Sequence, residues 1–245
     1  TQSPRCNKID PKTLETLGGF EMGKKVDDVS YTAFPHVLKD GTAFNLGNSI
    51  TSTGAYYNIV RFPKDDQLME RMEVVAKIPA RLKFHPSNIN MFGITENFFV
   101  IVETPLTMPV TSLVKLVVMK IPLTDVLKWL PNENTRIVLI NRTTGKIEHV
   151  FQADPFYFVS IVNQYEKDDH VVLDICCYKN SEIINATFVE SLRKNDPKDA
   201  LKFETRVLRF VLPLKVSEKT ANLVKRASSV SNNGKVFCTP ELMTN

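Results

Sequence analysis

The stretch SYTAFPHVLKDGTAFNLGN, residues 30–48, decides the fold because it predicts a β-hairpin whose plan recurs along the chain. The first run mixes apolar and polar residues and ends at a turn, Lys39-Asp40-Gly41. A second, more apolar run follows the turn. Asp-Gly between two such runs is a strong hairpin signal. His36 lies on the entering strand, where it is either a packing residue or one ligand of a metal site.

Two further segments repeat this plan, with a strand of mixed polarity, a short turn and a strongly apolar strand. They are SNINMFGITENFFVIVET, residues 87–104, and FYFVSIVNQYEKDDHVVLDICCY, residues 156–178. Their turns lie at Glu96-Asn97 and Asp168-Asp169. Separations of roughly fifty and seventy residues suit one hairpin per blade of a β-propeller, with an insertion in the longer gap.

Most of the remaining chain also consists of predicted strands. Runs of Val, Ile, Phe and Tyr lie between turn signals. They are residues 45–48, 56–62, 73–78, 98–103, 136–141, 146–151, 156–165, 170–177 and 207–212. Helical spacing is limited to Leu123, Val126, Leu127 and Leu130, and a second short helix is expected after Glu190. The sequence therefore predicts an all-β fold.

The composition is that of a globular chain that can bury a core, with 245 residues, 43% hydrophobic and 24% charged. A net charge of +4, with scattered Lys and Arg, argues against nucleic acid as a partner. Neither a signal peptide nor an apolar stretch of about 18 residues is visible. The four cysteines lack CxxC spacing and are expected to be reduced, which favours a cytoplasmic location.

The inner strand of each propeller blade lines the central channel. Counting back seven residues from Gly41, Asn97 and Asp168, one residue in each predicted turn, gives Phe34, Asn90 and Ile161. If the hairpins are equivalent, these side chains lie at one height and face a common axis. A metal held there would need histidine or carboxylate ligands, which none of the three residues supplies. Channel packing is the plain interpretation of each residue.

Several segments then identify a family. PHVLKDGTAFNLGNS, NINMFGITENFFVIVETP, FVSIVNQYEKDDHVVLDICCY and RFVLPL closely resemble the carotenoid cleavage oxygenases, in particular the animal carotene oxygenases and the retinoid isomerohydrolase of the eye. The resemblance extends over nearly the whole chain, including KIDPKTLET near its start. It implies a seven-bladed propeller with a non-haem Fe(II) on its axis, held by four histidines that glutamates support. It also implies an apolar tunnel for a carotenoid or retinoid, and an outer face that touches a membrane.

At about 40–45 residues per blade, seven blades need a longer chain. We therefore expect residues 1–245 to be part of a single β-propeller domain, with the N- and C-terminal blades and the family's last histidine outside this segment. The chain begins at Thr1 without Met, which agrees with that expectation. Residues 104–131 are interpreted as a short helical, apolar insertion at the rim.

The resemblance also places the family's iron ligands on this sequence. The motif that the first histidine opens reads FPH here, so Phe34 occupies the ligand position and His36 a non-ligand position. The second histidine corresponds to Asn90, before MFG, and the third to Ile161, before VNQYE. A glutamate that supports the ligands corresponds to Gln2. These are the same three axial positions that the turns indicate.

His36 cannot replace the lost ligand by sliding two residues along its strand. Such a slip moves a side chain by about 6.6 Å, whereas a metal–nitrogen bond of about 2 Å tolerates a few tenths of an ångström. Loss of a single supporting partner already lowers metal affinity about 10–100-fold. We therefore expect no cofactor, with Fe2+ as the alternative. His149 and His170, near turns, are predicted to be solvated.

An apolar small molecule is the expected partner, since aromatic and Met side chains suit a conjugated polyene. The predicted ligand-binding residues are Phe34, Asn90, Met91, Phe92, Phe156, Phe158 and Ile161. Lysines within an apolar stretch that ends near a Trp are typical of a segment that dips into a membrane, and packing on the rim is the alternative. The predicted membrane-facing residues are Leu113, Leu116, Val117, Leu123, Leu127 and Trp129.

Three functions follow from these interpretations. The first is a catalytically inactive member of the family, a pseudoenzyme that binds a carotenoid, retinoid or similar apolar ligand. The second is an active iron oxygenase or isomerase, of the 15,15'-cleaving or isomerooxygenase type, with a metal site that the alignment misses. The third is a structural or partner-binding propeller. The expected location is cytoplasmic, with peripheral attachment to an intracellular membrane as a further expectation.

Overall fold

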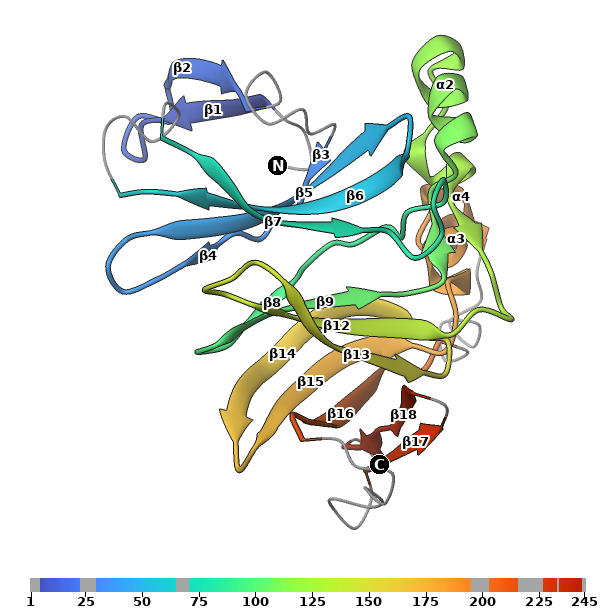
Figure 1. Cartoon of the computed structure of the whole chain (residues 1–245). Coiled ribbons are helices and arrows are strands. Elements are labelled where there is room, and N and C mark those ends of the chain that lie inside the picture. The colour runs from blue at the N-terminus through green and yellow to red at the C-terminus, as the bar shows by residue number, and fades with distance from the viewer. Residues whose placement is uncertain are drawn as a thin grey trace. The chain divides into compact units, whose positions relative to one another are not determined.

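The computed structural model describes residues 5–22, 30–64, 71–194, 203–215, 227–232 and 234–243, without the side chains of residues 20, 113–117 and 232. The chain forms two compact units (Figure 1). Unit 1 comprises residues 1–86 and 144–146, and unit 2 comprises residues 87–143 and 147–245. Gln2, the predicted position of a supporting glutamate, lies outside the described residues.

Unit 1 is built from antiparallel strands. They are β1 (Arg5–Ile9), β2 (Thr16–Glu21), β3 (Ser30–Tyr31), β4 (His36–Val37), β5 (Ala43–Thr51), β6 (Gly54–Phe62) and β7 (Glu73–Pro79). The main sheet has the order β3-β5-β6-β7, with β4 also paired to β5, and β1 and β2 form a separate hairpin. One core cluster joins the β1–β2 region to this sheet through Met22, Tyr31, Val60, Phe62 and Met72.

The hairpin predicted around Asp40-Gly41 is present in unit 1. His36 on β4 lies opposite Phe44 on β5, and Val37 lies opposite Ala43. The turn depends on Gly41, whose φ of +88° suits a residue without a side chain. The Asp40 carboxylate accepts the backbone N–H of residue 42 at 2.8 Å, which closes the turn.

Unit 2 contains two larger sheets and the helices. Its strands are β8 (Gly93–Ile94), β9 (Phe98–Glu103), β10 (Leu106–Thr107), β11 (Lys128–Trp129), β12 (Thr135–Asn141), β13 (Ile147–Ala153), β14 (Tyr157–Lys167), β15 (His170–Tyr178), β16 (Arg206–Pro213), β17 (Ser228–Asn232), β18 (Lys235–Thr239) and β19 (Glu241–Leu242). Its helices are α2 (Val110–Met119), the 3-10 turn η1 (Leu123–Val126), α3 (Glu182–Ala186) and α4 (Val189–Lys194).

The two larger sheets of unit 2 are almost entirely antiparallel. One has the order β17-β18-β13-β12-β9-β8 and the other β14-β15-β16-β19. The exception is β18, which pairs in parallel with β13. A four-stranded antiparallel sheet made of consecutive strands is the construction of a propeller blade.

Both hairpins predicted in unit 2 are present. Gly93 pairs with Val100 across the β8–β9 turn. At the β14–β15 turn, Asp168 and Asp169 have φ of +49° and +59°. Positive φ at both central residues is the geometry of a two-residue type I′ turn, which matches the twist of the flanking strands. Asp tolerates this conformation better than most residues, so the turn forms without glycine.

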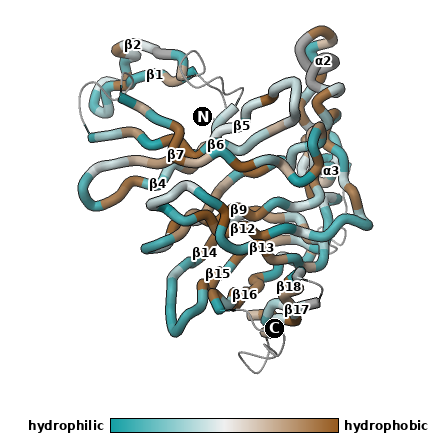
Figure 2. Tube along the Cα trace, in the orientation of Figure 1, coloured by the Kyte–Doolittle hydropathy of each residue, from teal (hydrophilic) through white to brown (hydrophobic). Residues whose placement is uncertain are grey.

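The core of unit 2 lies between its two larger sheets. Alternate residues of β9 and β12, such as Val100 and Leu139, pack against alternate residues of β14, β15 and β16, such as Phe158, Leu173 and Phe210. Figure 2 shows the corresponding hydrophobic segments along β9, β12 and β15. All six residues of β9 are buried, which explains why its first five residues form a continuous apolar run and do not alternate with polar ones.

The helix predicted at residues 123–130 is wrong. That segment contains only the four-residue η1 turn, and Trp129 then enters β11, where it pairs with Leu106 of β10. Helix α2 lies upstream instead, after Pro109, and ends at Lys120 in the left-handed conformation. Pro122 starts the 3-10 turn, and strand pairing draws the following residues into an extended conformation.

The all-β prediction is confirmed, and each predicted strand is observed within a few residues of its expected bounds. The second predicted helix corresponds to α4. The strands that were not predicted are β1, β2 and β17–β19, together with short pairing segments such as β10 and β11. The arrangement of blades around one axis, and the single domain over residues 1–245, stay predictions.

Candidate functional site

Phe34, the first predicted ligand position, lies in unit 1 in the break between β3 and β4, and its side chain is 52% exposed. The Asn45 side chain stabilises the backbone between β3 and β4 through two hydrogen bonds to Thr32. Its side-chain carbonyl accepts the Thr32 hydroxyl at 2.5 Å, and its amide group donates to the Thr32 backbone carbonyl at 3.1 Å. His36 is half-buried on β4. Phe34 therefore lies in a segment whose backbone is fixed by hydrogen bonds at Thr32.

Asn90 and Ile161, the other two positions, both lie in unit 2 and are half-buried. Met91, next to Asn90, contacts β14 directly, because the Ile161 backbone N–H lies 3.3 Å from the Met91 Sδ. At Gly93, a Cβ atom would lie 3.2 Å from the Ile161 Cδ1. The fold thus brings the segment after Asn90 against Ile161, although the two are far apart in sequence.

A hydrogen-bonded group of four residues fastens the same two segments together. The Glu166 carboxylate on β14 accepts the Thr95 hydroxyl at 2.6 Å, the Asn97 backbone N–H at 2.7 Å and the Asn97 side-chain amide at 2.8 Å. Arg142 donates to the backbone carbonyl of Thr95 at 2.6 Å. We call these four residues the Glu166 clasp.

Partial burial alone would raise the pKa of Glu166. The hydrogen bonds from Asn97 and Thr95, together with the positive charge of Arg142, outweigh this effect and lower its pKa below the usual value. The carboxylate is therefore ionised at neutral pH, and its charge strengthens the hydrogen bonds that it accepts.

The predicted ligand-binding aromatic residues contribute to packing in unit 2. Phe92 is fully buried, with its ring centroid 6.4 Å from that of Phe99. Phe156 and Phe158 belong to the core between the two sheets, and Phe156 lies 5.8 Å from Phe210. Ligand contact by these residues stays a prediction.

The residues at the predicted ligand positions do not fit an iron ion. Phe34 and Ile161 carry no donor atom, and the Asn90 amide oxygen is a neutral ligand where the resemblance implies an imidazole. Ile161 also packs its side chain against the core of unit 2. Among the described residues, no group of three His, Cys, Asp or Glu side chains has the geometry of a metal site.

The prediction of a solvated His149 is wrong. Its ring lies between Phe98 and Phe151, with centroid distances of 6.1 Å to each. Burial lowers its pKa below the usual value despite the nearby Glu148. Alternation along β13 places His149 on the same face as the buried Phe151, a signal that we missed, whereas the contact with Phe98 of β9 depends on the fold. His149 is thus a packing residue.

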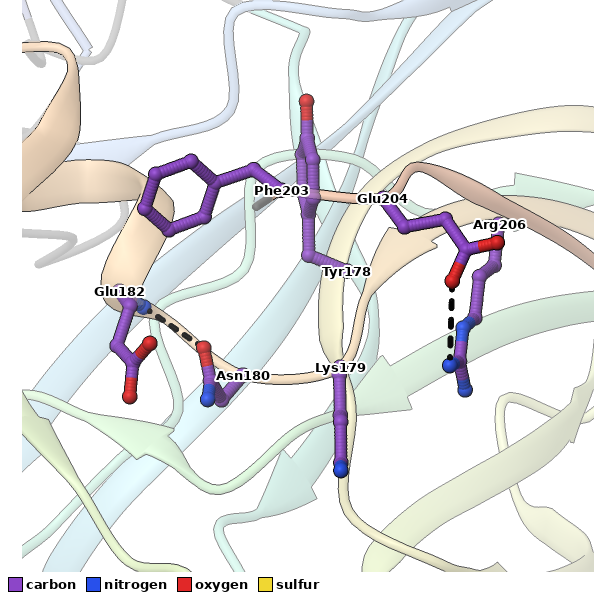
Figure 3. A pocket seen from close by; sticks show the side chains of 7 residues that line it. All are labelled: Tyr178, Lys179, Asn180, Glu182, Phe203, Glu204 and Arg206. Atoms are coloured by element: carbon purple, nitrogen blue, oxygen red, sulfur yellow. Dashed lines mark hydrogen bonds and ion pairs between the residues drawn. The ribbon is translucent and has the colours of Figure 1, made fainter. Parts of the chain in front are cut away.

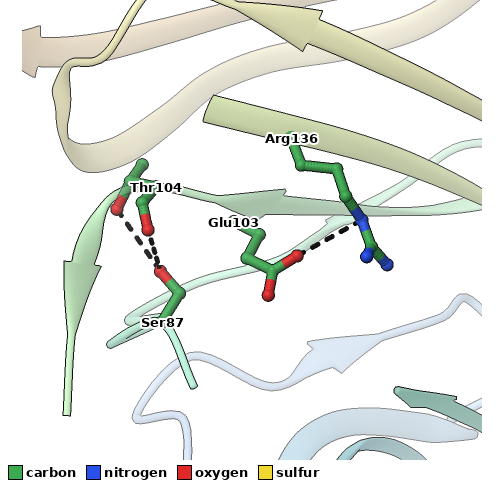
Figure 4. Close-up of polar contacts among 4 residues, drawn as sticks. All are labelled: Ser87, Glu103, Thr104 and Arg136. Carbon is green, nitrogen blue, oxygen red and sulfur yellow. Dashed lines mark hydrogen bonds and ion pairs between the residues drawn. The ribbon is translucent and has the colours of Figure 1, made fainter. Parts of the chain in front are cut away.

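A buried charge pair lies where β9 ends and residues 104–131 begin (Figure 4). Glu103 is 3% exposed, and its carboxylate lies 3.2 Å from the Arg136 guanidinium on β12. The Ser87 hydroxyl donates to the Thr104 backbone carbonyl at 2.7 Å. Because β10 and β11 then pair, the two ends of the segment 104–131 lie side by side at this anchored place within unit 2. This cluster is structural.

Two cavities in unit 2 have mixed polar linings. One, of about 280 Å³, is lined by Tyr178, Lys179, Asn180, Glu182, Phe203, Glu204 and Arg206 (Figure 3). The other, of about 350 Å³, is lined by Tyr165, Lys167, Asp168, His170, Val172, Arg209, Val211 and Glu241. Neither contains a predicted ligand-binding residue. Both are lined by charged and aromatic residues near strand ends. We did not predict a site at either place from the sequence.

Of the predicted membrane-facing residues, Leu123 is 38% exposed, and Leu127 and Trp129 are half-buried. The side chains of the other three, on α2, lie outside the description. Val118 and Met119 at the end of α2 are 72% and 64% exposed. No helix among the described residues is long and apolar enough to span a bilayer.

Residues 1–238 match the family model described as Retinal pigment epithelial membrane protein. The chain belongs to this family. It is 39% identical over 216 residues to carotenoid isomerooxygenase of Drosophila melanogaster, covering 87% of this chain and 35% of that protein. It is 30% identical over 228 residues to human mitochondrial carotenoid-cleaving dioxygenase, covering 89% of this chain and 39% of that protein. The family resemblance is thereby confirmed.

Solved structures show the same fold at low sequence identity. A variant of Synechocystis apocarotenoid oxygenase superposes with a TM-score of 0.67 and 14% identity, covering all of this chain and 45% of that one. Pseudomonas brassicacearum lignostilbene dioxygenase gives a TM-score of 0.60 and 18% identity, covering 96% and 43%. The chain spans less than half the length of each of these relatives.

Proposed function

We propose that this chain is part of a catalytically inactive member of the carotenoid oxygenase family that binds a carotenoid, retinoid or similar apolar molecule. The observation that carries the proposal is the environment of Ile161. Its side chain packs against the core of unit 2 and approaches Gly93 at the position where the family resemblance implies an imidazole. A hydrocarbon there offers a metal no lone pair.

The chemistry of the other two positions supports the loss of iron. Phe34 also lacks a donor, and Asn90 offers only a neutral amide oxygen. Loss of one partner that merely supports a ligand lowers metal affinity about 10–100-fold. Loss of three direct ligands has a larger effect, so any histidine beyond this chain would have to hold iron without them.

The apolar ligand is supported by the relatives and by the substitutions themselves. The names of the relatives state that they act on carotenoids. Phe34 and Ile161 add apolar surface at positions where the family resemblance implies polar imidazoles. Long conjugated molecules bind in sites lined by aromatic and aliphatic side chains with few polar groups. Retention of a ligand without cleavage is consistent with these changes.

The deciding experiment restores the ligands in the full-length protein. The triple variant Phe34→His, Asn90→His, Ile161→His should bind Fe2+ or Co2+ at one ion per chain, while the unaltered protein contains far less than one iron per chain by elemental analysis. The matched control replaces the third change by Val162→His. Val162 is 61% exposed and adjacent to Ile161, so its side chain points away from the core, and this variant should not bind.

Ligand binding has its own measurement. A carotenoid or retinoid that co-purifies gives a visible or near-ultraviolet absorption band and can be extracted and identified by mass spectrometry. Absence of any such band, together with no uptake of added β-carotene or retinal, would leave the structural or partner-binding propeller as the function.

The alternative of an active iron oxygenase or isomerase is favoured by the 39% identity to a carotenoid isomerooxygenase. It requires an iron site built from residues other than those aligned here. Stoichiometric iron in the unaltered full-length protein, with cleavage or isomerisation of a carotenoid, would establish it and refute the inactive assignment.

We further propose a cytoplasmic location with the surface of residues 104–131 against a membrane. The exposed Val118 and Met119 at the end of α2 support this proposal. Co-sedimentation of the full-length protein with phospholipid vesicles, reduced by Val118→Asp and Met119→Asp, would test it. Unchanged sedimentation of that double variant would contradict it.

A further inference from the structure

We propose that Glu166 is a positioning residue that sets the spacing between the segment carrying Asn90 and the strand carrying Ile161. Glu166 does not correspond to any of the iron ligands or supporting glutamates that the resemblance places on this chain. The inference about spacing stands on contacts within unit 2. Only its consequence for a ligand or metal between positions 90 and 161 rests on the proposed function.

Three contacts with β14 hold the two segments together, and two of them are at Ile161. Its backbone N–H lies 3.3 Å from the Met91 Sδ. Its Cδ1 lies 3.2 Å from the Cβ position of Gly93, which has no side chain. The third contact is at Glu166, which binds the β8–β9 turn through three hydrogen bonds.

The Glu166 clasp is the strongest of the three contacts. Its bonds are short and involve a charged acceptor, whereas a thioether accepts only weakly and Gly93 contributes only van der Waals contact. The clasp therefore sets where the turn sits along β14. Because β8 begins only three residues after Asn90, a shift of the turn moves Asn90 relative to Ile161.

Arg142, which directly follows β12, also binds the β8–β9 turn. Its guanidinium donates to the backbone carbonyls of Thr95 and Glu96 at 2.6 and 2.8 Å, and its backbone N–H donates to the Asn97 carbonyl at 2.9 Å. The turn is therefore fixed to its own sheet by Arg142. Glu166 then links the β8–β9 turn to the sheet that contains β14.

The geometry distinguishes a carboxylate from its amide. One oxygen of Glu166 accepts from the Thr95 hydroxyl and the Asn97 N–H, and the other accepts from the Asn97 amide. In Glu166→Gln, one oxygen becomes an NH2 group that faces a donor in either orientation. Either one bond is lost or the Asn97 side-chain amide must turn over to present its oxygen, and in both cases the bonds lose their charge assistance.

The first test is amide hydrogen exchange in the full-length protein. Glu166→Gln should speed exchange at Ile161 and across residues 91–98 by about tenfold or more, with the exchange of β12 and β16 unchanged. Thr95→Val should accelerate the same peptides. Asp169→Asn is the matched control, since it removes a carboxylate at the same hairpin, which binds Lys215 and makes no hydrogen bond or ion pair with the β8–β9 turn among the described residues, and it should leave them unchanged.

The second test uses Co2+ as a probe in the triple histidine variant described above. Adding Glu166→Gln should weaken Co2+ binding by about tenfold or more and alter its visible ligand-field spectrum, while adding Asp169→Asn should change neither. A merely stabilising residue would lower the melting temperature without altering the spectrum.

The outcomes separate the two proposals. Unchanged exchange at residues 91–98 and 161 in Glu166→Gln overturns the positioning role, whatever the metal data show. Failure of the triple variant to bind Co2+ refutes the placement of the ligand positions, and exchange still decides the role of Glu166. Equal Co2+ affinity and spectrum with and without Glu166→Gln also overturn the positioning role.

Discussion

Gly93 on β8 lies close to β14. A Cβ atom there would lie 3.1 Å from the Val100 Cβ and 3.2 Å from the Ile161 Cδ1. Both distances are tighter than ordinary van der Waals contact, and the Val100 atom is close to its backbone and cannot rotate away. The absence of a side chain at Gly93 therefore permits the approach of the two segments.

Gly93→Ala is expected to destabilise the protein by about 1–3 kcal/mol, the usual cost of overpacking a core. Urea denaturation followed by fluorescence measures the change. Gly18→Ala is the control, because nothing lies within 4 Å of its Cβ position and its φ is not positive. Equal stability of the two variants would mean that β8 and β14 are not so close.

For single residues, the sequence indicated which residues are candidates for the site, but it did not predict which side chains surround them. Phe34, Asn90 and Ile161 could be assigned because each lies seven residues before a recognisable turn. The contact of Met91 with Ile161 could not be predicted, since it joins two segments whose packing depends on side chains from three strands. The contact of His149 with Phe98 was missed for the same reason.

A cross-strand ion pair strengthens the four-stranded sheet of unit 2. The Arg209 guanidinium on β16 binds the Asp174 carboxylate on β15 through two bonds of 2.7 and 2.8 Å. Asp174 is 6% exposed, whereas the Arg209 side chain is 31% exposed. The carboxylate therefore depends on its partner more than the arginine does.

Arg209→Met should destabilise the protein by about 2–3 kcal/mol, below the ~3–5 kcal/mol of a fully buried pair, because it leaves Asp174 buried without a partner. The double variant Asp174→Leu, Arg209→Met should recover most of this loss. Thermal and urea unfolding give both values. For comparison, Glu73→Gln breaks an exposed pair with Arg61 and should change stability by less than about 0.5 kcal/mol. A single variant as stable as the double would refute this account.

The Glu166 clasp predicts a dependence of stability on pH. The folded pKa of Glu166 is lowered from its model-compound value of 4.5, so the carboxylate stabilises the fold above that pH and loses this effect as the pH falls through the folded pKa. Unaltered protein should therefore be more stable than Glu166→Gln at pH 7, and this difference should shrink as the pH falls below 4.5. Urea midpoints over a series of pH values from 7 downward test this, and a constant difference would contradict it.

Strong strands and turns could be predicted, and weaker elements could not. The predicted hairpins combine turn residues with β-branched and aromatic runs. Strands β1 and β17 contain Lys, Asn or Ser where such runs are expected, and they form because a partner strand pairs with them. Helix α2 is rich in Val, which has low helix propensity, so local preference did not reveal it.

The described chain as a whole contains four free cysteines, two of which are inaccessible. Cys177 and Cys238 belong to the core of unit 2 and are each 1% exposed. Burial raises the pKa of Cys177 to about 12 and that of Cys238 to about 11. Their thiolates are therefore scarce, and a reagent reaches them only when the two sheets separate.

In the native protein at pH 8, Cys177 and Cys238 should resist a thiol reagent, while all four cysteines react in urea above the unfolding midpoint. Mass spectrometry of digested protein assigns the labels, with Cys6 and Cys176, which are half-buried, as internal comparisons. Native labelling of Cys177 as fast as that of Cys176 would show that the sheets do not pack as described.

The sequence predicted the family and the fold class of the molecule. That Phe34, Asn90 and Ile161 occupy the ligand positions of a metal centre stays a prediction. The arrangement of Phe34 relative to Asn90 and Ile161 stays a prediction, because Phe34 belongs to unit 1 and the other two to unit 2. Contacts within unit 2 bring two of the three segments together, and the restored-histidine variant tests the third.

The parallel pairing of β13 with β18 joins Phe151 and Gln152 to Val236 and Phe237. During translation, the edge of β13 has no neighbour until the ribosome has released the residues of β18. The nascent polypeptide thus carries an open strand edge through the synthesis of β14, β15 and β16, and such edges recruit other chains. Slow decoding or premature termination in this interval would favour aggregates over native protein.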